Sequence, residues 1–490
     1  MANVIKLKNS GTANSAPTSL EVGELAINYA DGKIFYKDTS NAVVEFTGPS
    51  GLIISNTAPA VTDILWADTS VTGVGVVPVG GTTGQMLAKS SSADYDAAWA
   101  TPVTSSDLAL KAPLASPALT GTPTSPTAAV GTNTTQLATT EFVTTAASNV
   151  TSGFRNVVIN GDMKVAQRGT SASLITTSGY YTADRMSFIP NTMGQWTQSV
   201  VSNVPAGSGF YNNLTLQCTT ADASPSSGDY VFLQQKFEGQ DVQRFAKGTA
   251  SAKPFALSFW VKSNLTGTYI AELIDTDNTR QVSASYTINA SSTWEKKIII
   301  FPADTTGVFD RDNDVSLRLN FVLGAGSTYT SGTLNTAWAS TTNANRYVGQ
   351  TNLASAESNS WSITGIQLEE GSVATPFEQR PIGVELDLCF RYYQKMVDPA
   401  GVGVANASSQ ATRVLMPLYT KMRAAPTSTI SGTVNFWNGG STGTATSLLG
   451  TYNSVSQGQL DFAGGVGSAG QAVTLYTTGG SQFIDFSAEL

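Results

Sequence analysis

Apolar and polar residues alternate between Trp361 and Leu368, which is the pattern of a β-strand with one buried face. Trp361 and Ile363 fall on one face of this expected strand, whereas Ile366 and Leu368 continue the alternation in the opposite phase. The phase changes at Gly365, and a change of phase at a glycine inside a strand indicates a β-bulge. The sequence therefore predicts a strand that is bulged at Gly365.

Helical spacing replaces the strand pattern after Pro381. Leu386, Phe390 and Tyr393 recur at intervals that place them on one face of a helix. We therefore expect an amphipathic helix over residues 382–396. The last strand of one β-domain would then lead directly into a helix that opens the next domain.

The N-terminal residues 1–47 have the pattern of a small β-module. Two strand-like runs, 23–28 and 33–37, flank the dipeptide Asp31-Gly32, which is a strong signal for a hairpin. Because so short a module buries little apolar surface by itself, it needs a partner to be stable.

Residues 48–110 predict a thin β shaft with short strands at 85–89 and 97–100. Residues 111–153 predict a linker. Its proline-spaced first half is expected to be extended, because proline is excluded from helices and central strands.

A helix is expected in the second half of this linker, starting at Thr134-Thr135. Its apolar stripe recurs every four residues and consists of Ala138, Phe142, Ala146 and Val150. Nothing in the linker covers this stripe, but three copies around an axis would cover it. The sequence therefore predicts a homotrimer with this stripe as its seam.

Residues 154–376 predict a two-sheet sandwich, because strand patterns alternate there with Gly, Asn, Asp and Ser turns. The expected strands are 231–237, 255–262, 269–274, 296–301, 315–323 and 361–368. Residues 377–490 predict a distal β-domain whose last residues, 482–490, again alternate as a strand. The fold class expected for the whole chain is mainly β, in an elongated multi-domain arrangement.

Composition narrows the functional classes. Charged residues make up 13% of the chain, about half of the ~25% that is usual. The net charge is −8 without a long basic run, so a nucleic-acid partner is not expected. No stretch approaches the ~20 apolar residues of a membrane span, and no signal peptide is expected.

Histidine is absent from the sequence. This excludes Ser-His-Asp and Cys-His nucleophiles and histidine-ligated zinc. Cys218 and Cys389 are far apart in the sequence, and we expect two buried thiols in a chain that folds in a reducing cytoplasm. No cofactor is expected.

Four stretches resemble known protein families. The junction over residues 364–394 is TGIQLEEGSVATPFEQRPIGVELDLCFRYYQ, and it resembles a junction in the distal parts of bacteriophage tail fibres. The N-terminal EVGELAIN…DGKIFYKD is similar to the module that docks many such fibres to the tail. The opening NVVINGDMKVAQRGTS is similar to the start of their jelly-roll module, and FALSFWVKS is similar to a strand of carbohydrate-binding modules.

This resemblance implies a homotrimeric fibre on the virion, assembled in the host cytoplasm. The N-terminus would attach to a tail adaptor, nozzle or baseplate protein. The C-terminal half would bind a bacterial surface glycan such as lipopolysaccharide, without being an enzyme. Two alternatives stay open: a tailspike-type depolymerase, since glycosidases use carboxylates rather than histidine, and a purely structural fibre that carries another receptor-binding tip.

Carboxylate groups offer two weak candidates. Asp310, Asp312 and Asp314 have the spacing of a calcium loop, but the glycine and glutamate that such a loop needs further on are missing. A solvated turn is therefore the favoured interpretation. The neighbouring Glu369 and Glu370 point to opposite faces of a strand, so they are expected to be a solvated strand end.

Aromatic residues are the candidates for glycan contact, because sugar rings stack on aromatic faces beside amide and carboxylate groups. Trp260 lies on the polar face of its expected strand, where it serves either as a ligand platform or as an intersubunit contact. The full set of candidates is Trp196, Trp260, Trp338, Trp437 and Tyr452. Of these, Trp196, Trp338 and Trp437 are expected in loops, because they lie in stretches rich in Gly, Ser, Thr and Asn. The scarcity of charge favours neutral sugars.

The expected seam gives the first prediction. Phe142→Asp should weaken trimer assembly, because it places a charge in a packed apolar contact. Sedimentation of the wild-type chain at micromolar concentration should show a trimer, and the variant should dissociate. A wild-type chain that is a stable monomer would contradict the predicted seam.

Overall fold

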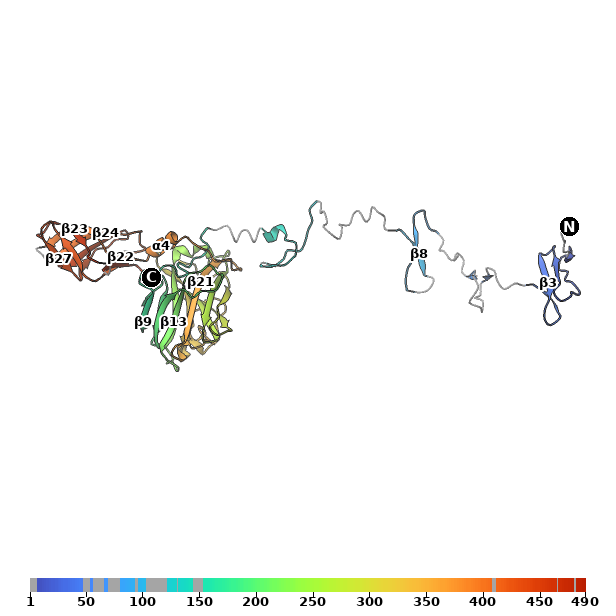
Figure 1. Cartoon of the computed structure of the whole chain (residues 1–490), viewed down its shortest axis with the longest axis horizontal. Helices are drawn as coiled ribbons and strands as arrows, with labels where there is room; N and C mark the ends of the chain where they lie inside the picture. The colour runs from blue at the N-terminus through green and yellow to red at the C-terminus, as the bar shows by residue number, and fades with distance from the viewer. Residues whose placement is uncertain are drawn as a thin grey trace. The chain divides into compact units, whose positions relative to one another are not determined.

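A computed structural model describes residues 7–46, 53–55, 66–68, 80–92, 96–102, 121–129, 131–143, 153–407, 411–464, 466–479 and 482–490. The chain divides into two compact units, Met1–Thr124 and Ser125–Leu490. The described structure is mainly β, as expected (Figure 1). No helix among the described residues has the length and apolar character needed to cross a membrane.

The first unit opens with a four-stranded sheet. Its strands, in sheet order, are β1 (Lys8–Ser10), β2 (Leu25–Asn28), β3 (Lys33–Lys37) and β4 (Val43–Glu45). β2 and β3 form the antiparallel hairpin that the Asp31-Gly32 dipeptide predicts. Leu20, Ala26 and Phe35 are the buried side chains of its small core.

Two further strand pairs follow in this unit. They are β5 (Ile53–Ser55) with β6 (Trp66–Asp68), and β7 (Met86–Lys89) with β8 (Ala97–Ala100). The second pair confirms the strands expected at 85–89 and 97–100.

The linker helix begins later than expected. Its described helical residues are 140–143, and the hydroxyl of Thr139 caps them by accepting a hydrogen bond from the Phe142 N–H at 3.1 Å. Ala138 therefore precedes the helix and is exposed, whereas Phe142 is half-buried. Ala146 and Val150 lie outside the described residues, so the trimer seam stays a prediction.

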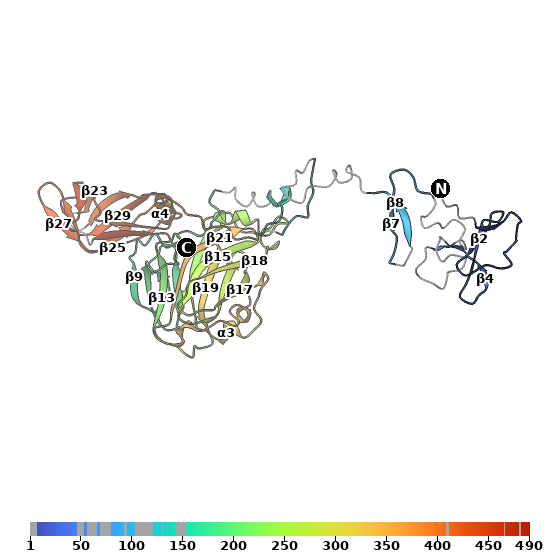
Figure 2. The same ribbon diagram turned by 45° about the vertical axis from the view of Figure 1, so that its right-hand side comes forward.

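The second unit begins with a sandwich of two antiparallel sheets (Figure 2). The six-stranded sheet contains, in order, β18 (Glu295–Phe301), β15 (Phe255–Ser263), β21 (Ser360–Glu370), β13 (Asn213–Thr220), β12 (Gln195–Val201) and β9 (Ser171–Ile175). The seven-stranded sheet contains, in order, β10 (Gly179–Tyr180), β11 (Ser187–Asn191), β14 (Tyr230–Glu238), β19 (Val315–Ala325), β16 (Gly267–Asp275), β17 (Arg280–Ile288) and β20 (Ala339–Ser340).

Every strand that the sequence predicts in the sandwich is present, with ends that differ by a few residues. The pattern missed the strands before residue 230 and also β17 and β20. Short helices lie in the segments that connect the strands: α3 (Ser327–Thr330), η1 (Gly239–Asp241), η2 (Gln243–Phe245), η3 (Asn343–Asn345) and η4 (Leu353–Ser355).

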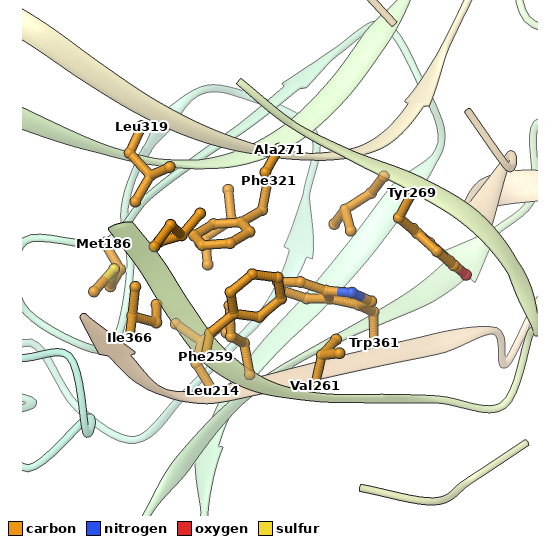
Figure 3. Packing of buried hydrophobic residues seen from close by; sticks show 14 of the residues in the cluster. Met186, Leu214, Phe259, Val261, Tyr269, Ala271, Leu319, Phe321, Trp361 and Ile366 are labelled. Atoms are coloured by element: carbon orange, nitrogen blue, oxygen red, sulfur yellow. The ribbon is translucent and has the colours of Figure 1, made fainter. Parts of the chain in front are cut away.

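Aliphatic and aromatic side chains together fill the space between the two sheets (Figure 3). Phe259 from the six-stranded sheet meets Phe321 from the seven-stranded sheet edge to face, with ring centroids 5.0 Å apart. Phe321 also lies against Trp361, at 5.9 Å. Such pairs add stabilisation beyond the area they bury, so these rings fix how the two sheets face each other.

The predicted bulge in β21 is confirmed. Gly365 has a φ of +63°, and the pairing of β21 with β15 shifts register at this point. The extra residue lets Trp361 and Ile363 before the bulge, and Ile366 and Leu368 after it, all enter the same core. β21 therefore contributes apolar side chains to the core along its whole length, although its alternation changes phase at Gly365.

The helix after the sandwich is shorter than expected. α4 spans Ile382–Phe390, and the chain then forms strand β22 (Tyr393–Val397), so the prediction of a helix to residue 396 is wrong. Arg391 ends the helix and binds Glu238 of the sandwich at 2.6 and 2.8 Å. Tyr393 pairs with Ser487 of a later strand. Tertiary contacts therefore override helical spacing here.

The last part of the chain forms two further sheets around a hydrophobic core of their own, and we refer to it as the distal domain. Its three-stranded sheet contains β22, β31 (Phe483–Ser487) and β25 (Thr427–Ser431). Its seven-stranded sheet contains, in order, β27 (Thr442–Ala445), β26 (Val434–Trp437), β30 (Ala472–Tyr476), β23 (Gly401–Ala407), β24 (Ala411–Pro417), β29 (Gln457–Ala463) and β28 (Leu448–Thr451). β31 confirms the strand expected over residues 482–490.

The bulge gives a prediction about stability. Gly365→Ala should destabilise the sandwich by at least ~2 kcal/mol, because the new Cβ would overlap the ring of Phe210 and the backbone is left-handed. The matched control is Gly383→Ala in α4, where a Cβ meets no atom within 4 Å. Denaturant unfolding followed by tryptophan fluorescence should show a loss for the first variant alone, and equal midpoints would contradict the role given to the bulge.

Candidate functional site

The outer face of the six-stranded sheet carries a candidate site that combines a hollow with aromatic side chains. Strand β15 turns Phe259 and Val261 into the core, so Trp260 and Lys262 point outward. Trp260 lies opposite Lys296 on β18 and Thr364 on β21. Because directly opposite residues share a face, all three side chains lie on the outer side of the sheet, where Trp260 is half-buried, Lys296 is exposed and Thr364 is covered by other residues.

Hydroxyl groups continue this surface across two more strands. Ser362 of β21 lies opposite both Lys262 and Thr215 of β13, and the Ser362 and Thr215 hydroxyls are 2.8 Å apart. The Thr364 hydroxyl donates to the backbone oxygen of Asn212 at 2.7 Å. The polar groups are therefore held in fixed positions by contacts with their neighbours.

A hollow of about 260 Å³ opens in this face. It is lined by Val201, Asn203, Thr215, Lys262, Ser263, Asn264, Ser292, Ser360 and Ser362. No carboxylate is among these lining residues. The volume lies near the lower end of small-molecule sites, which span ~300–1,000 Å³, so the hollow is suited to a small polar group.

Lys262 and Trp294 meet at the edge of the hollow through Asn203. The Lys262 ammonium donates to Asn203 Oδ1 at 2.9 Å, and Trp294 Nε1 donates to the same oxygen at 3.4 Å. The ammonium also lies 5.0 Å from the centre of the Trp294 ring, a cation–π contact. Burial lowers the pKa of Lys262.

Two tryptophans therefore flank Lys262. Trp260 precedes it by two residues on the same strand face, roughly 7 Å away along the strand, and both tryptophans are half-buried. Trp294 was not predicted. Its signal was present, because the exposed Lys296 and Ile298 continue the same alternation on β18 and place Trp294 on the outer face.

Trp196 cannot present a ring to a ligand in this fold. It is fully buried in β12, where its Nε1 donates to the backbone oxygen of Met193 at 2.8 Å and its ring meets Phe188 edge to face. The prediction of a loop tryptophan was wrong because the flanking polar residues alternate on the outside of a strand.

Trp338 is a loop anchor. It is half-buried, its Nε1 donates to the backbone oxygen of Pro302 at 2.8 Å, and its ring packs against Phe255. The ammonium of Lys247 lies 5.0 Å from its ring. The ring of Trp338 is therefore already in contact with side chains of the protein itself.

Trp437 and Tyr452 lie in the distal domain and are 49% and 61% exposed. Trp437 ends strand β26 rather than lying in a loop, and Tyr452 follows β28. Four strands separate β26 from β28 in the sheet, which puts the two rings roughly 24 Å apart. The structure does not bring these two candidates together.

The acidic candidates also find other roles. Asp310, Asp312 and Asp314 lie on an exposed turn, and Asp314 faces Arg423 at 3.4 Å. Within the described part of the chain, no group of three His, Cys, Asp or Glu side chains could hold a metal ion. The calcium interpretation of the three aspartates is therefore unsupported.

The prediction that Glu369 lies at a solvated strand end is wrong, because this residue is buried. Its carboxylate accepts hydrogen bonds from the backbone N–H and the hydroxyl of Thr375, each at 2.7 Å. It thereby ties the end of β21 to the segment that leads to α4. Both cysteines, Cys218 and Cys389, are buried and free, as expected.

Comparisons with known proteins give partial likenesses only. No family model matches the sequence, and no curated protein matches it. Among solved structures, the chain is similar to the enzymatically active domain of tailspike protein 4 from bacteriophage CBA120, with 14% identity and a TM-score of 0.25 over 45% of this chain. The chain covers 22% of the tailspike chain.

Carbohydrate-binding modules are also among the similar structures. The family 11 module of the cellulosomal cellulase Lic26A-Cel5E of Clostridium thermocellum is 14% identical, with a TM-score of 0.22 and coverage of 44% of this chain and 96% of the module. TmCBM61, solved with β-1,4-galactotriose, is 9% identical, with a TM-score of 0.22 and coverage of 44% and 99%.

Proposed function

We propose that this protein is a bacteriophage tail fibre that binds a glycan of the bacterial surface through the outer face of its six-stranded sheet. The observation that carries this proposal is the pairing of two half-buried tryptophans, Trp260 and Trp294, with a polar hollow between β12 and β15. Aromatic faces offer stacking surfaces for sugar C–H groups, and the hydroxyl and amide groups offer partners for sugar hydroxyls.

Attachment to the tail is assigned to the N-terminal module, on the resemblance of its hairpin to the docking modules of such fibres. Its small buried core, around Leu20 and Phe35, supports a module that gains stability from a partner. In a homotrimer the glycan sites would act together, so that weak individual binding becomes strong attachment.

Binding without cleavage is favoured at this face. Glycoside hydrolysis uses two carboxylates that flank the scissile bond, and the residues that line the hollow include neither aspartate nor glutamate. Release of reducing sugar from host polysaccharide by the purified chain would instead favour the depolymerase alternative. Failure of the chain to block adsorption would favour a structural fibre.

The glycan face gives a direct prediction. The full chain should bind a subset of bacterial oligosaccharides on a glycan array, and Trp260→Ala and Trp294→Ala should each weaken binding about fivefold per site, as expected for ~1 kcal/mol of lost stacking. Trp437→Ala in the distal domain is the matched control and should bind as the wild type does. If both sandwich variants are folded and bind normally, the face is not the receptor site.

Tail attachment gives a separate prediction. Deletion of residues 1–47 should abolish incorporation of the fibre into phage particles, while the purified remainder keeps its binding to cells. Particles grown with the truncated fibre can be analysed by immunoblotting. Truncated fibre on intact particles would contradict the docking role of this module.

A further inference from the structure

Lys262 is a cation without an anionic partner. Its only hydrogen-bond acceptor within the described part of the chain is the neutral oxygen of Asn203, and no carboxylate there pairs with it. Two other buried or half-buried cations of the sandwich do have such partners: Lys247 lies 3.1 Å from Asp304, and Arg346 lies 2.8 Å from Glu272. Lys262 differs in this respect from Lys247 and Arg346.

The ammonium of Lys262 also has donors to spare. An ammonium group carries three N–H donors, and Asn203 accepts one of them. The remaining donors belong to a side chain that lines the hollow. A charge that is partly removed from water favours a counter-charge and further acceptors, so an anion in the hollow would satisfy both needs.

The surrounding surface is positive as well. Lys296 lies directly opposite Trp260 on the same face, is exposed, and has no ion pair among the described residues. The lining of the hollow contributes no negative charge to balance it. The whole chain carries a net charge of −8, so this patch is positive on an acidic protein and would attract anions locally.

We propose that the glycan bound at this face carries a negative group, a carboxylate or a phosphate, and that Lys262 receives this group in the hollow while Trp260 and Trp294 contact the sugar rings. This inference rests on the proposed function and deepens it. The low overall charge of the chain favours neutral sugars as ligands. The proposal departs from that expectation, because the charge at this site differs from the charge of the chain as a whole.

Two sources could supply the negative group. A hexuronic acid or another acidic sugar supplies a carboxylate, and a phosphorylated sugar supplies a phosphate. Both can accept from the ammonium while the ring carbons face the tryptophans, so a single array that carries uronate-containing, phosphate-containing and neutral bacterial oligosaccharides separates the sources. Each hit is then compared with its carboxyl-reduced or phosphatase-treated form.

The decisive variant is Lys262→Gln in the full chain. It should bind the acidic hits about ten- to a hundredfold more weakly, which corresponds to the loss of a hydrogen bond to a charged group. Lys262→Arg keeps the charge and should retain most of the binding. Lys253→Gln is the matched control, because Lys253 is a half-exposed lysine of the same domain that pairs with Glu370 at 3.5 Å, and it should bind as the wild type does.

Salt gives an independent readout that a structural role of Lys262 would not change. Wild-type binding to the acidic hits should weaken as ionic strength rises, and the dependence should be smaller for Lys262→Gln. Binding to neutral oligosaccharides alone, or equal binding of intact and carboxyl-reduced or dephosphorylated hits, would overturn this inference and leave the proposed function intact. Absence of binding to every oligosaccharide on the array would overturn the proposed function itself.

Discussion

The β-bulge at Gly365 is the constraint on which the sandwich depends. Because the strand changes phase there, Trp361 and Leu368 reach the same core although they lie on opposite sides of the bulge. The bulge also exposes the backbone of Ile366 to the opening loop of the domain: its N–H donates to Gly161 at 2.9 Å, and its carbonyl accepts from the Asn156 side chain at 3.0 Å. The bulge at Gly365 therefore allows β21 to form hydrogen bonds with the first residues of the sandwich.

The same strand connects the core to the candidate site. Ser362 and Thr364 face the outer side of the sheet, where Ser362 lines the hollow, while Trp361 and Ile363 face the core. The hollow therefore has a floor whose side chains cannot shift without disturbing the packing beneath. Rigid support of this kind lowers the entropic loss on binding a sugar.

Buried ion pairs connect the sandwich to the residues that follow it in the sequence. Arg185 binds Glu489 near the end of the chain, and Arg391 binds Glu238. In each pair at least one side chain is almost completely removed from water. Removal of one partner from such a pair is strongly destabilising, because it leaves an uncompensated buried charge. The Arg391–Glu238 pair holds the chain directly after α4, whose last residue is Phe390.

Local pattern was sufficient where a strand alternates against one core, as in β21 and β31, and even the bulge could be predicted from Gly365. It failed where tertiary contacts decide the outcome. Trp196 was predicted in a loop, because its neighbours in the sequence are polar and resemble those of a loop. Glu369 was predicted to be solvated, because its hydrogen-bond partner Thr375 lies outside the strand and could not be identified from the strand pattern.

The hollow could not be predicted, because its lining comes from strands that are distant in sequence. Val201, Thr215, Lys262 and Ser362 lie on β12, β13, β15 and β21 in turn. Their meeting follows from the order of strands in the sheet, and alternation within one strand carries no information about that order. Only Trp260 could be singled out, because it is an aromatic residue on an otherwise polar face.

Hydrogen–deuterium exchange of the full chain, with and without an oligosaccharide selected on the array, tests the central claim most directly. A glycan seated on the six-stranded sheet should slow amide exchange at residues 260–264, 292–296 and 360–364 and leave residues 434–452 of the distal domain unchanged. Protection confined to residues 434–452 would contradict the account and place the receptor site on the distal domain.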